Sequence, residues 1–337
     1  LFGVSTPLAK LLVGAVPPVM LAGLLYLGSG LGLVALTVAR RALRRVRAPR
    51  AEAPITRADL PWLAGAVVAG GILAPVVLLW GLAGTTASNA SLLLNLEGVI
   101  TMLIAAALFR EAVGRRVWLA ALVMLVAGVL LVHDPREPLR FSAHAVCIVA
   151  ACLLWALDNN LTRKVAGADP VQIAAIKGLI AGATNLAVAL GVGDTLPGFP
   201  TLAAAAAIGF ASYGVSLVLF IYALRHLGAA RTAAHFSTAP FIGAALAVPL
   251  LGEPVTTTLV AAAALMALAT WLVLNERHEH EHIHEQRVHT HRHLRDEHHQ
   301  HAHRGDEGPE PHTHEHVHDP LIHRHPHLPD LHHRHGH

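Results

Sequence analysis

The chain has few charged residues, few aromatic residues and only two cysteines. Of its 337 residues, 14% are charged and 5% are aromatic. Two cysteines, Cys147 and Cys152, do not indicate a disulfide framework. The formal net charge of +3 is too small to indicate nucleic-acid binding. The apolar stretches also lack a Ser/His/Asp order, a phosphate-cradling glycine loop and a closed metal motif, so an enzyme is not expected.

Hydrophobic sequence dominates instead, at 54% of the residues, in runs separated by short polar loops up to residue 276. A run of about 20 apolar residues matches the bilayer core, where the backbone must satisfy its own hydrogen bonds in a helix. We therefore predict an all-α membrane protein with ten transmembrane helices. The expected spans are roughly 1–12, 17–39, 61–80, 87–109, 117–133, 143–161, 171–191, 202–224, 232–251 and 256–274.

The first of these spans is too short to cross a bilayer, and the chain begins with Leu1. We expect the first transmembrane helix to be truncated in this sequence, with its true start missing. A signal peptide is disfavoured, because no basic leader and no small-residue cleavage site precede the second span.

Basic residues in the loops predict the orientation. One set of loops holds Arg40, Arg41, Arg44, Arg45, Arg47, Arg50, Arg57, Arg110, Arg115, Arg116, Arg163, Lys164, Arg225 and Arg231. The opposite loops hold only Lys10, Arg136 and Arg140 near span ends. Because cytoplasmic loops are enriched in Lys and Arg, both termini are expected in the cytoplasm of a multi-pass protein of a bacterial inner membrane.

The body contains an internal repeat. Residues 85–132 correspond to 227–274, so that Glu111 matches Glu253 and Asn95 matches Ser237, while 1–10 match 154–163. Five spans are repeated, and an odd number predicts halves of opposite orientation with a substrate path between them. The expected domains are a first repeat at 1–133, a second repeat at 143–276 and a His-rich tail at 277–337.

The residues at 2–10 (FGVSTPLAK), at 86–97 (TASNASLLLNLE) and at Arg110-Glu111 before a Gly128-bearing span resemble the EamA family of the drug/metabolite transporter superfamily. The resemblance covers about 1–276 and implies two inverted five-helix repeats, a central cavity and carrier-type transport of small metabolites, with efflux common. The family usually has Pro after the acidic residue of the fourth span. This chain has Gly98 there, which leaves a helix break at that point open.

Polar residues within the spans are the candidates for the substrate or coupling path. Glu97 lies near the middle of the fourth span, where a carboxylate costs at least about 2.5 kcal/mol unless it faces protein, water or a partner. It is either a functional group or a hydrogen-bonded structural one. The candidate path comprises Glu97, Asn95, Ser91, Asp158, Asn159, Lys177 and His235.

Each of the other candidates also has a structural interpretation. Ser91 and Asn95 share one helical face and are favoured as polar contacts between helices. Asp158 and Asn159 stand where a helix end would emerge into water. Lys177 either extends to the cytoplasmic surface or pairs with Glu97 or Asp158 and binds a substrate carboxylate. A lone His235 is more often packed than a ligand.

The tail is rich in histidine and is expected to be disordered without metal, because it has too little apolar sequence to pack. Imidazoles that alternate with carboxylates favour divalent metals such as Zn, Ni or Co. The candidate ligands are His278, His280, His282, His284, His289, His291, His293, His298, His299, His301, His303, His312, His314, His316 and His318.

The sequence thus predicts a secondary transporter of small metabolites, favoured as an efflux carrier, whose tail binds divalent metal in a regulatory or buffering role. A divalent metal transporter and a non-transporting membrane metal buffer or sensor remain alternatives. The expected partners are the lipid bilayer, a small-molecule substrate, metal ions and a second copy in a homodimer. No cofactor is required, and no nucleic-acid partner is expected.

Overall fold

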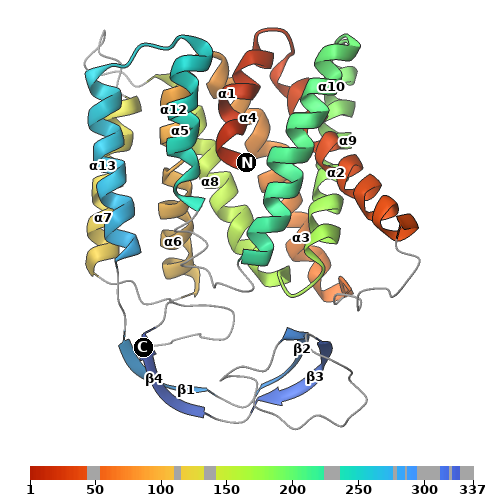
Figure 1. Cartoon of the computed structure of the whole chain (residues 1–337), viewed down its shortest axis with the longest axis vertical. Helices are drawn as coiled ribbons and strands as arrows, with labels where there is room; N and C mark the ends of the chain where they lie inside the picture. The colour runs from red at the N-terminus through yellow and green to blue at the C-terminus, as the bar shows by residue number, and fades with distance from the viewer. Residues whose placement is uncertain are drawn as a thin grey trace.

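The computed structural model describes residues 1–43, 54–109, 115–132, 142–223, 236–275, 279–284, 287–293, 312–318 and 321–326. The described residues of 1–275 form helices joined by turns and loops, and most of these helices run roughly side by side (Figure 1). The first half holds α1 (Phe2–Val13), α2 (Pro18–Leu43), η1 (Arg57–Asp59), α3 (Leu60–Ala66), η2 (Val67–Leu73), α4 (Ala74–Ala83), α5 (Ala87–Leu93), α6 (Leu96–Phe109) and α7 (Arg115–Val132). The second half holds α8 (Ala143–Val165), α9 (Pro170–Gly191), α10 (Phe199–Ile208), η3 (Gly209–Val215), a helical stretch at 216–223, α12 (Ala239–Leu251) and α13 (Thr257–Leu274).

Among the described residues, seven helical stretches are long and apolar enough to cross a membrane. Three shorter apolar helices, at Phe2–Val13, Trp118–Val132 and Ala239–Leu251, coincide with the expected first, fifth and ninth spans. A helical, multi-span membrane body is therefore confirmed, while the count of ten crossings stays a prediction. Large apolar side chains such as Trp118, Leu122 and Val129 are about half exposed on α7, as expected for a surface that faces lipid.

Capping residues determine where several of these helices begin. Thr86, Ser142, Asp169 and Thr256 each precede a helix and accept a hydrogen bond from one or two backbone N–H groups of its first turn. Such caps satisfy donors that have no partner within the helix. They fix where the apolar segments begin even though those segments show little helical amphipathicity.

The two halves pack against each other through glycines on α2 and α9. A Cβ at Gly23 would touch the backbone of Leu186, and one at Gly30 would touch the backbone of Gly178. Because numbers rise along α2 as they fall along α9, the two helices are antiparallel. Equivalent helices of opposite direction are what an inverted repeat requires. The small residues permit this close approach of the backbones.

The sequence offset of 142 recurs in the structure. When 142 is added to the residue numbers of α7 (Arg115–Val132), they match those of α13 (Thr257–Leu274). The π-helical segments η2 (Val67–Leu73) and η3 (Gly209–Val215) are related in the same way. The expected fourth span at 87–109 is not one helix, because α5 ends at Leu93 and α6 begins at Leu96. The second half is also interrupted, at 237–238 just before α12.

The described residues of the tail form four short strands, where the sequence predicts no regular structure. They are β1 (Glu279–His284), β2 (Arg287–His293), β3 (His312–His318) and β4 (Leu321–Pro326). β1 pairs antiparallel with β4, and β2 with β3. The expectation of a tail that is disordered without metal stays a prediction. Alternation of His with other residues has the period of two that a strand accommodates.

Candidate functional site

A cavity of about 70 Å³ lies between the halves of the body. Since one water molecule needs roughly 10 to 15 Å³ of such space, the cavity has room for a small molecule. Both halves contribute to its walls, as an inverted repeat with a central path predicts. The lining residues are Phe2, Tyr26, Ser29, Glu97, Trp155, Asp158, Asn159, Ala174, Lys177, Gly178, Ser212, Tyr213, Ser216, Leu217, Phe220 and Phe236.

One wall of the cavity contains a buried ion pair between Asp158 of α8 and Lys177 of α9. The Lys177 ammonium donates to both carboxylate oxygens of Asp158, at 2.6 and 2.8 Å, and to the Thr162 hydroxyl at 3.2 Å. The Thr162 hydroxyl in turn donates to Asp158 at 2.8 Å. Lys177 has three N–H groups, and these three contacts account for all of them. The pair therefore presents no free cation to the cavity.

This geometry decides between interpretations that the sequence left open. Lys177 is 3% exposed and Asp158 is 6% exposed. Lys177 therefore does not extend to the cytoplasmic surface, and Asp158 does not stand at a helix end in water. Of the two acidic partners considered for Lys177, the structure selects Asp158. Gly70 of η2 makes room for that carboxylate, because a Cβ at Gly70 would collide with it.

Glu97 lies beside this pair but is joined to an amide instead of a cation. It is the second residue of α6 and is 8% exposed. The Asn159 side-chain amide donates to its carboxylate at 2.8 Å. Among the described residues, no cationic side chain forms an ion pair with Glu97. A carboxylate in the first turn of a helix is favoured by the helix dipole, which partly offsets its burial.

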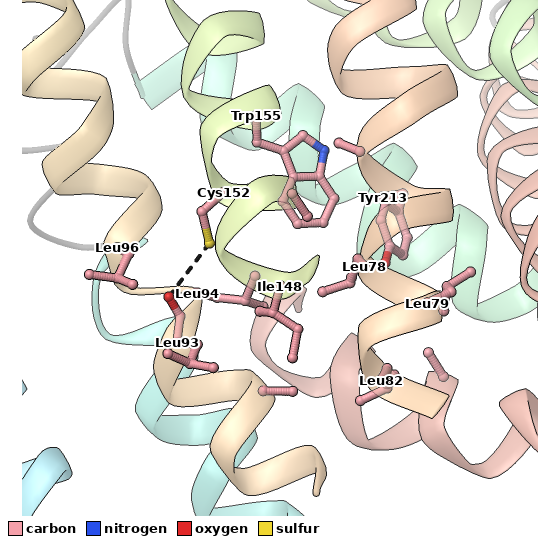
Figure 2. Packing of buried hydrophobic residues seen from close by; sticks show 14 of the residues in the cluster. Leu78, Leu79, Leu82, Leu93, Leu94, Leu96, Ile148, Cys152, Trp155 and Tyr213 are labelled. Atoms are coloured by element: carbon pink, nitrogen blue, oxygen red, sulfur yellow. Dashed lines mark hydrogen bonds between the residues drawn. The ribbon is translucent and has the colours of Figure 1, made fainter. Parts of the chain in front are cut away.

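The break before Glu97 frees a backbone carbonyl that α8 satisfies. After the break, the N–H of Glu97 donates to the carbonyl of Leu94, one residue later than a regular helix would use. The carbonyl of Leu93 instead accepts from the Cys152 thiol at 3.5 Å. Figure 2 shows this contact, with Cys152 pointing from its helix toward the end of α5. The weak thiol donor thus helps to accommodate the interruption.

The π-helical segment η2 is stabilised in a similar way. Pro75 follows it and has no N–H, so carbonyls one turn earlier lose their usual donor. The Gly70 carbonyl accepts from the Tyr26 hydroxyl at 2.6 Å and from the Trp155 indole at 2.9 Å. The Asn185 amide donates to the carbonyls of Gly71 and Ile72 at 3.4 and 3.2 Å. Both ring residues are thereby fixed in the cavity wall.

Aromatic rings form the remaining wall. Phe2 is at their centre, with ring centroids 6.0 Å from Trp155, 6.0 Å from Tyr213 and 5.1 Å from Phe236. Tyr26 lies 5.5 Å from Tyr213, and Phe220 lies 5.0 Å from Phe236. These edge-on and tilted arrangements are the favourable ones for aromatic pairs. They also make a rigid apolar boundary for whatever enters.

Not all of the predicted path residues line the cavity. Glu97, Asp158, Asn159 and Lys177 do, whereas Ser91 and Asn95 are buried elsewhere. The Asn95 amide lies 3.9 Å from the sulfur of Met266 on α13, which is consistent with its favoured role as a contact between helices.

The remaining predicted ligands are not described at the level of side chains. His235, His278, His298, His299, His301 and His303 lie outside the described residues. The other tail histidines are described only as strand backbone. Their predicted part in metal binding stays a prediction.

The sequence interpretation missed the aromatic wall. Described rings of the cavity are Phe2, Tyr26, Trp155, Tyr213, Phe220 and Phe236, from a chain with five Trp, three Tyr and eight Phe in all. Scarcity of aromatic residues was one available signal. A second was the repeat, because the alignment of 1–10 with 154–163 places Phe2 opposite Trp155.

Comparisons with known proteins agree with this architecture. The model of the EamA-like transporter family matches residues 1–133 and 143–275. An uncharacterized transporter from Methanothermobacter thermautotrophicus (strain ATCC 29096 / DSM 1053 / JCM 10044 / NBRC 100330 / Delta H) is 28% identical over 264 residues, or 75% of this chain and 77% of that protein. One solved crystal structure is similar in fold, with a TM-score of 0.59 and 19% identity over 80% of this chain and 91% of that one.

Proposed function

Because the chain belongs to the EamA-like transporter family, whose members are membrane transporters, we propose that it carries small metabolites outward across a bacterial inner membrane. Transport proceeds by alternating access between the inverted halves, with both termini in the cytoplasm. The observation that carries the proposal is the cavity between the halves, which holds Glu97, Asp158 and Lys177 within a membrane body. Buried ionisable residues at such depth are costly and are typical of transport paths.

Within this mechanism Glu97 is the coupling group that exchanges a proton or another cation. The support is electrostatic. Asp158 and Lys177 neutralise each other, whereas Glu97 is held only by the Asn159 amide among the described residues. A carboxylate without a fixed counter-ion binds and releases a proton or another cation more readily than a carboxylate held in an ion pair.

The proposal also assigns metal binding to the tail, which binds Zn, Ni or Co in a regulatory or buffering role near the cytoplasmic mouth of the transport path. Support comes from its composition and from the strand register, in which His280 is opposite His325 and His291 is opposite His314. Directly opposite residues of antiparallel strands have Cβ atoms about 5 Å apart, so that one ion can be shared. A divalent metal transporter is less well supported, since no three His, Cys, Asp or Glu side chains of the described body are grouped to hold a metal.

Reconstituted protein tests the proposal directly. Flux of metabolites and of Zn, Ni and Co would be measured in liposomes for the full chain, for a chain ending at residue 277 and for Glu97→Gln. We expect metabolite flux that persists without the tail and falls by about tenfold or more in Glu97→Gln. Unchanged flux in a correctly inserted Glu97→Gln protein would remove the coupling role. Metal flux that depends on the tail would favour the metal transporter, and metal binding without any flux would favour the buffer or sensor.

A further inference from the structure

The charge balance of the cavity points to the class of substrate. Among the described lining residues, Glu97 and Asp158 are the only carboxylates and Lys177 is the only ammonium. Lys177 is already bound by Asp158 and Thr162. An ionised Glu97 therefore leaves one negative charge without a cation. Within a membrane, such a charge is stabilised most directly by a cationic ligand.

The same argument disfavours anionic and zwitterionic substrates. A substrate carboxylate would need a cationic partner, and the only ammonium in the described wall has its three N–H groups in use. To reach it, the carboxylate would have to displace Asp158, which would then be buried without its own partner. That exchange is costly in a site of low polarity.

The ring wall is suited to a cation with an apolar body. Phe2, Trp155, Tyr213, Phe220 and Phe236 bring several aromatic rings to one small space, and a ring face attracts a cation within about 6 Å of its centroid. Rings do not ligate divalent metals, which prefer N, O and S donors. A bare metal ion would thus lose hydration and gain no ligand from the ring wall, whereas an organic ammonium carries apolar groups that pack against the rings.

We propose that the cavity binds organic ammonium compounds, with Glu97 as the counter-ion, the aromatic rings around the apolar body, and hydroxyls of the cavity lining as further polar contacts. These hydroxyls come from Ser29 of α2, Ser212 of η3 and Ser216 just after it. The inference rests on the proposed transport function for its physiological meaning. Its test requires binding alone.

Four radiolabelled probes with one phenyl ring and a short chain separate the alternatives. They are phenethylammonium, the neutral phenethyl alcohol, the anion 3-phenylpropanoate and the zwitterion phenylalanine. Equilibrium dialysis with the purified full chain in detergent, near neutral pH, measures each Kd. We expect the ammonium to bind at least about tenfold more tightly than any of the other three.

Variants then assign the site. Glu97→Gln is expected to weaken ammonium binding by about tenfold or more and to change alcohol binding by less than about threefold. Phe236→Leu is expected to weaken ammonium binding by about threefold. Asp194→Asn, which removes a carboxylate in the loop after α9, is the matched control and leaves all four Kd values unchanged. Thermal unfolding shows whether each variant is folded.

Several results would overturn the proposal. They are tightest binding of the anion or the zwitterion, equal ammonium binding by folded Glu97→Gln, or no binding of the ammonium by the wild-type chain. If other solutes cross liposomes while the ammonium fails to bind, the substrate class is wrong and the transport function stands. If the ammonium binds through Glu97 but no solute crosses the bilayer, the site is right and the transport function is wrong.

Discussion

In the first half of the body, Pro75 follows the π-helical segment and Gly98 follows the break in the fourth helix. At the equivalent positions the second half has Leu217 and Pro240. Both halves nevertheless have the π-helical segment, and both interrupt the fourth helix. Proline at these points is therefore not required for the irregular backbone. Other groups that satisfy the freed carbonyls, such as the Cys152 thiol at Leu93, are part of what maintains it.

The chemistry of the two halves differs more than their backbones do. Glu97 corresponds to Ala239 at the offset of 142, and Lys177 corresponds to Leu25 when α2 and α9 are aligned at their first prolines, Pro18 and Pro170. Each half thus supplies a different part of the cavity. The first half contributes the unpaired carboxylate, and the second contributes the ion pair and the amide of Asn159.

The largest effect is expected when Lys177 of the ion pair is replaced by leucine, the residue at the equivalent position of the first half. Lys177→Leu should lower the free energy of unfolding by about 3 to 5 kcal/mol, because Asp158 stays buried without its cation. Chemical unfolding in detergent measures the loss. Asp158→Asn/Lys177→Leu should recover part of it, and a single variant as stable as the wild type would show that the pair contributes nothing.

A smaller loss should follow removal of the amide that bonds η2. Asn185→Leu leaves the carbonyls of Gly71 and Ile72 without that donor and should cost about 1 to 3 kcal/mol in unfolding free energy. The equivalent residue on α2 is Leu33, which packs in an apolar cluster with Leu217. Leu33→Asn should also destabilise, because that site offers apolar contacts. Stabilisation by Leu33→Asn would contradict this difference between the halves.

The contact of Glu253 with the start of α5 should contribute less. Its carboxylate accepts from the backbone N–H groups of Ala87 and Ser88. Glu253→Gln should therefore reduce stability by about 1 kcal/mol, since one oxygen is replaced by an NH2 group that cannot accept and the other loses its charge. Glu111, its equivalent, lies outside the described residues. A similar loss in Glu111→Gln, measured by the same unfolding experiment, would show that the second half uses the same cap.

The smallest effect is expected when Gly98 of the first half is replaced by proline, the residue at the equivalent position of the second half. Gly98 is the third residue of α6, and a Cβ there would meet no atom within 4 Å. Proline is tolerated in the first turn of a helix, so Gly98→Pro should change the unfolding free energy by less than about 1 kcal/mol. Gly98→Ala is the control for added volume. A large loss in Gly98→Pro alone would show that the N–H of Gly98 has a needed partner.

The sequence was sufficient for features that depend on composition and periodicity. Apolar runs predicted the helical membrane body, and the offset of 142 predicted the equivalence of α7 and α13. Polar residues in apolar spans identified Glu97, Asp158 and Lys177 as candidates for the path, although the structure was needed to show that Asp158 and Lys177 are buried. Their identity carried this information because burying a charge is expensive wherever the helix lies.

Features that depend on contacts between helices could not be predicted in the same way. The partner of Lys177 is set by how α8 and α9 are placed, and sequence spacing left Asp158 and Glu97 as equal alternatives. Ser91, Asn95 and Glu97 fall in one predicted span, but only Glu97 of the three lines the cavity, and it follows the break after Leu93. The π-helical segment η3 has no proline to indicate it, and the strands of the tail depend on pairing between distant residues.

The equal positions of η2 and η3 have an evolutionary consequence. A π-helical segment is a wide helical turn, and one acquired separately by each half would have no reason to fall at the same place. Yet Val67–Leu73 and Gly209–Val215 are related by the same offset of 142 residues that relates α7 to α13. The simplest history is one ancestral half that already contained the turn before its gene was duplicated and fused. Prolines, carboxylates and the lysine then diverged on an inherited backbone, so a chain assembled from two copies of the first half should still form both wide turns.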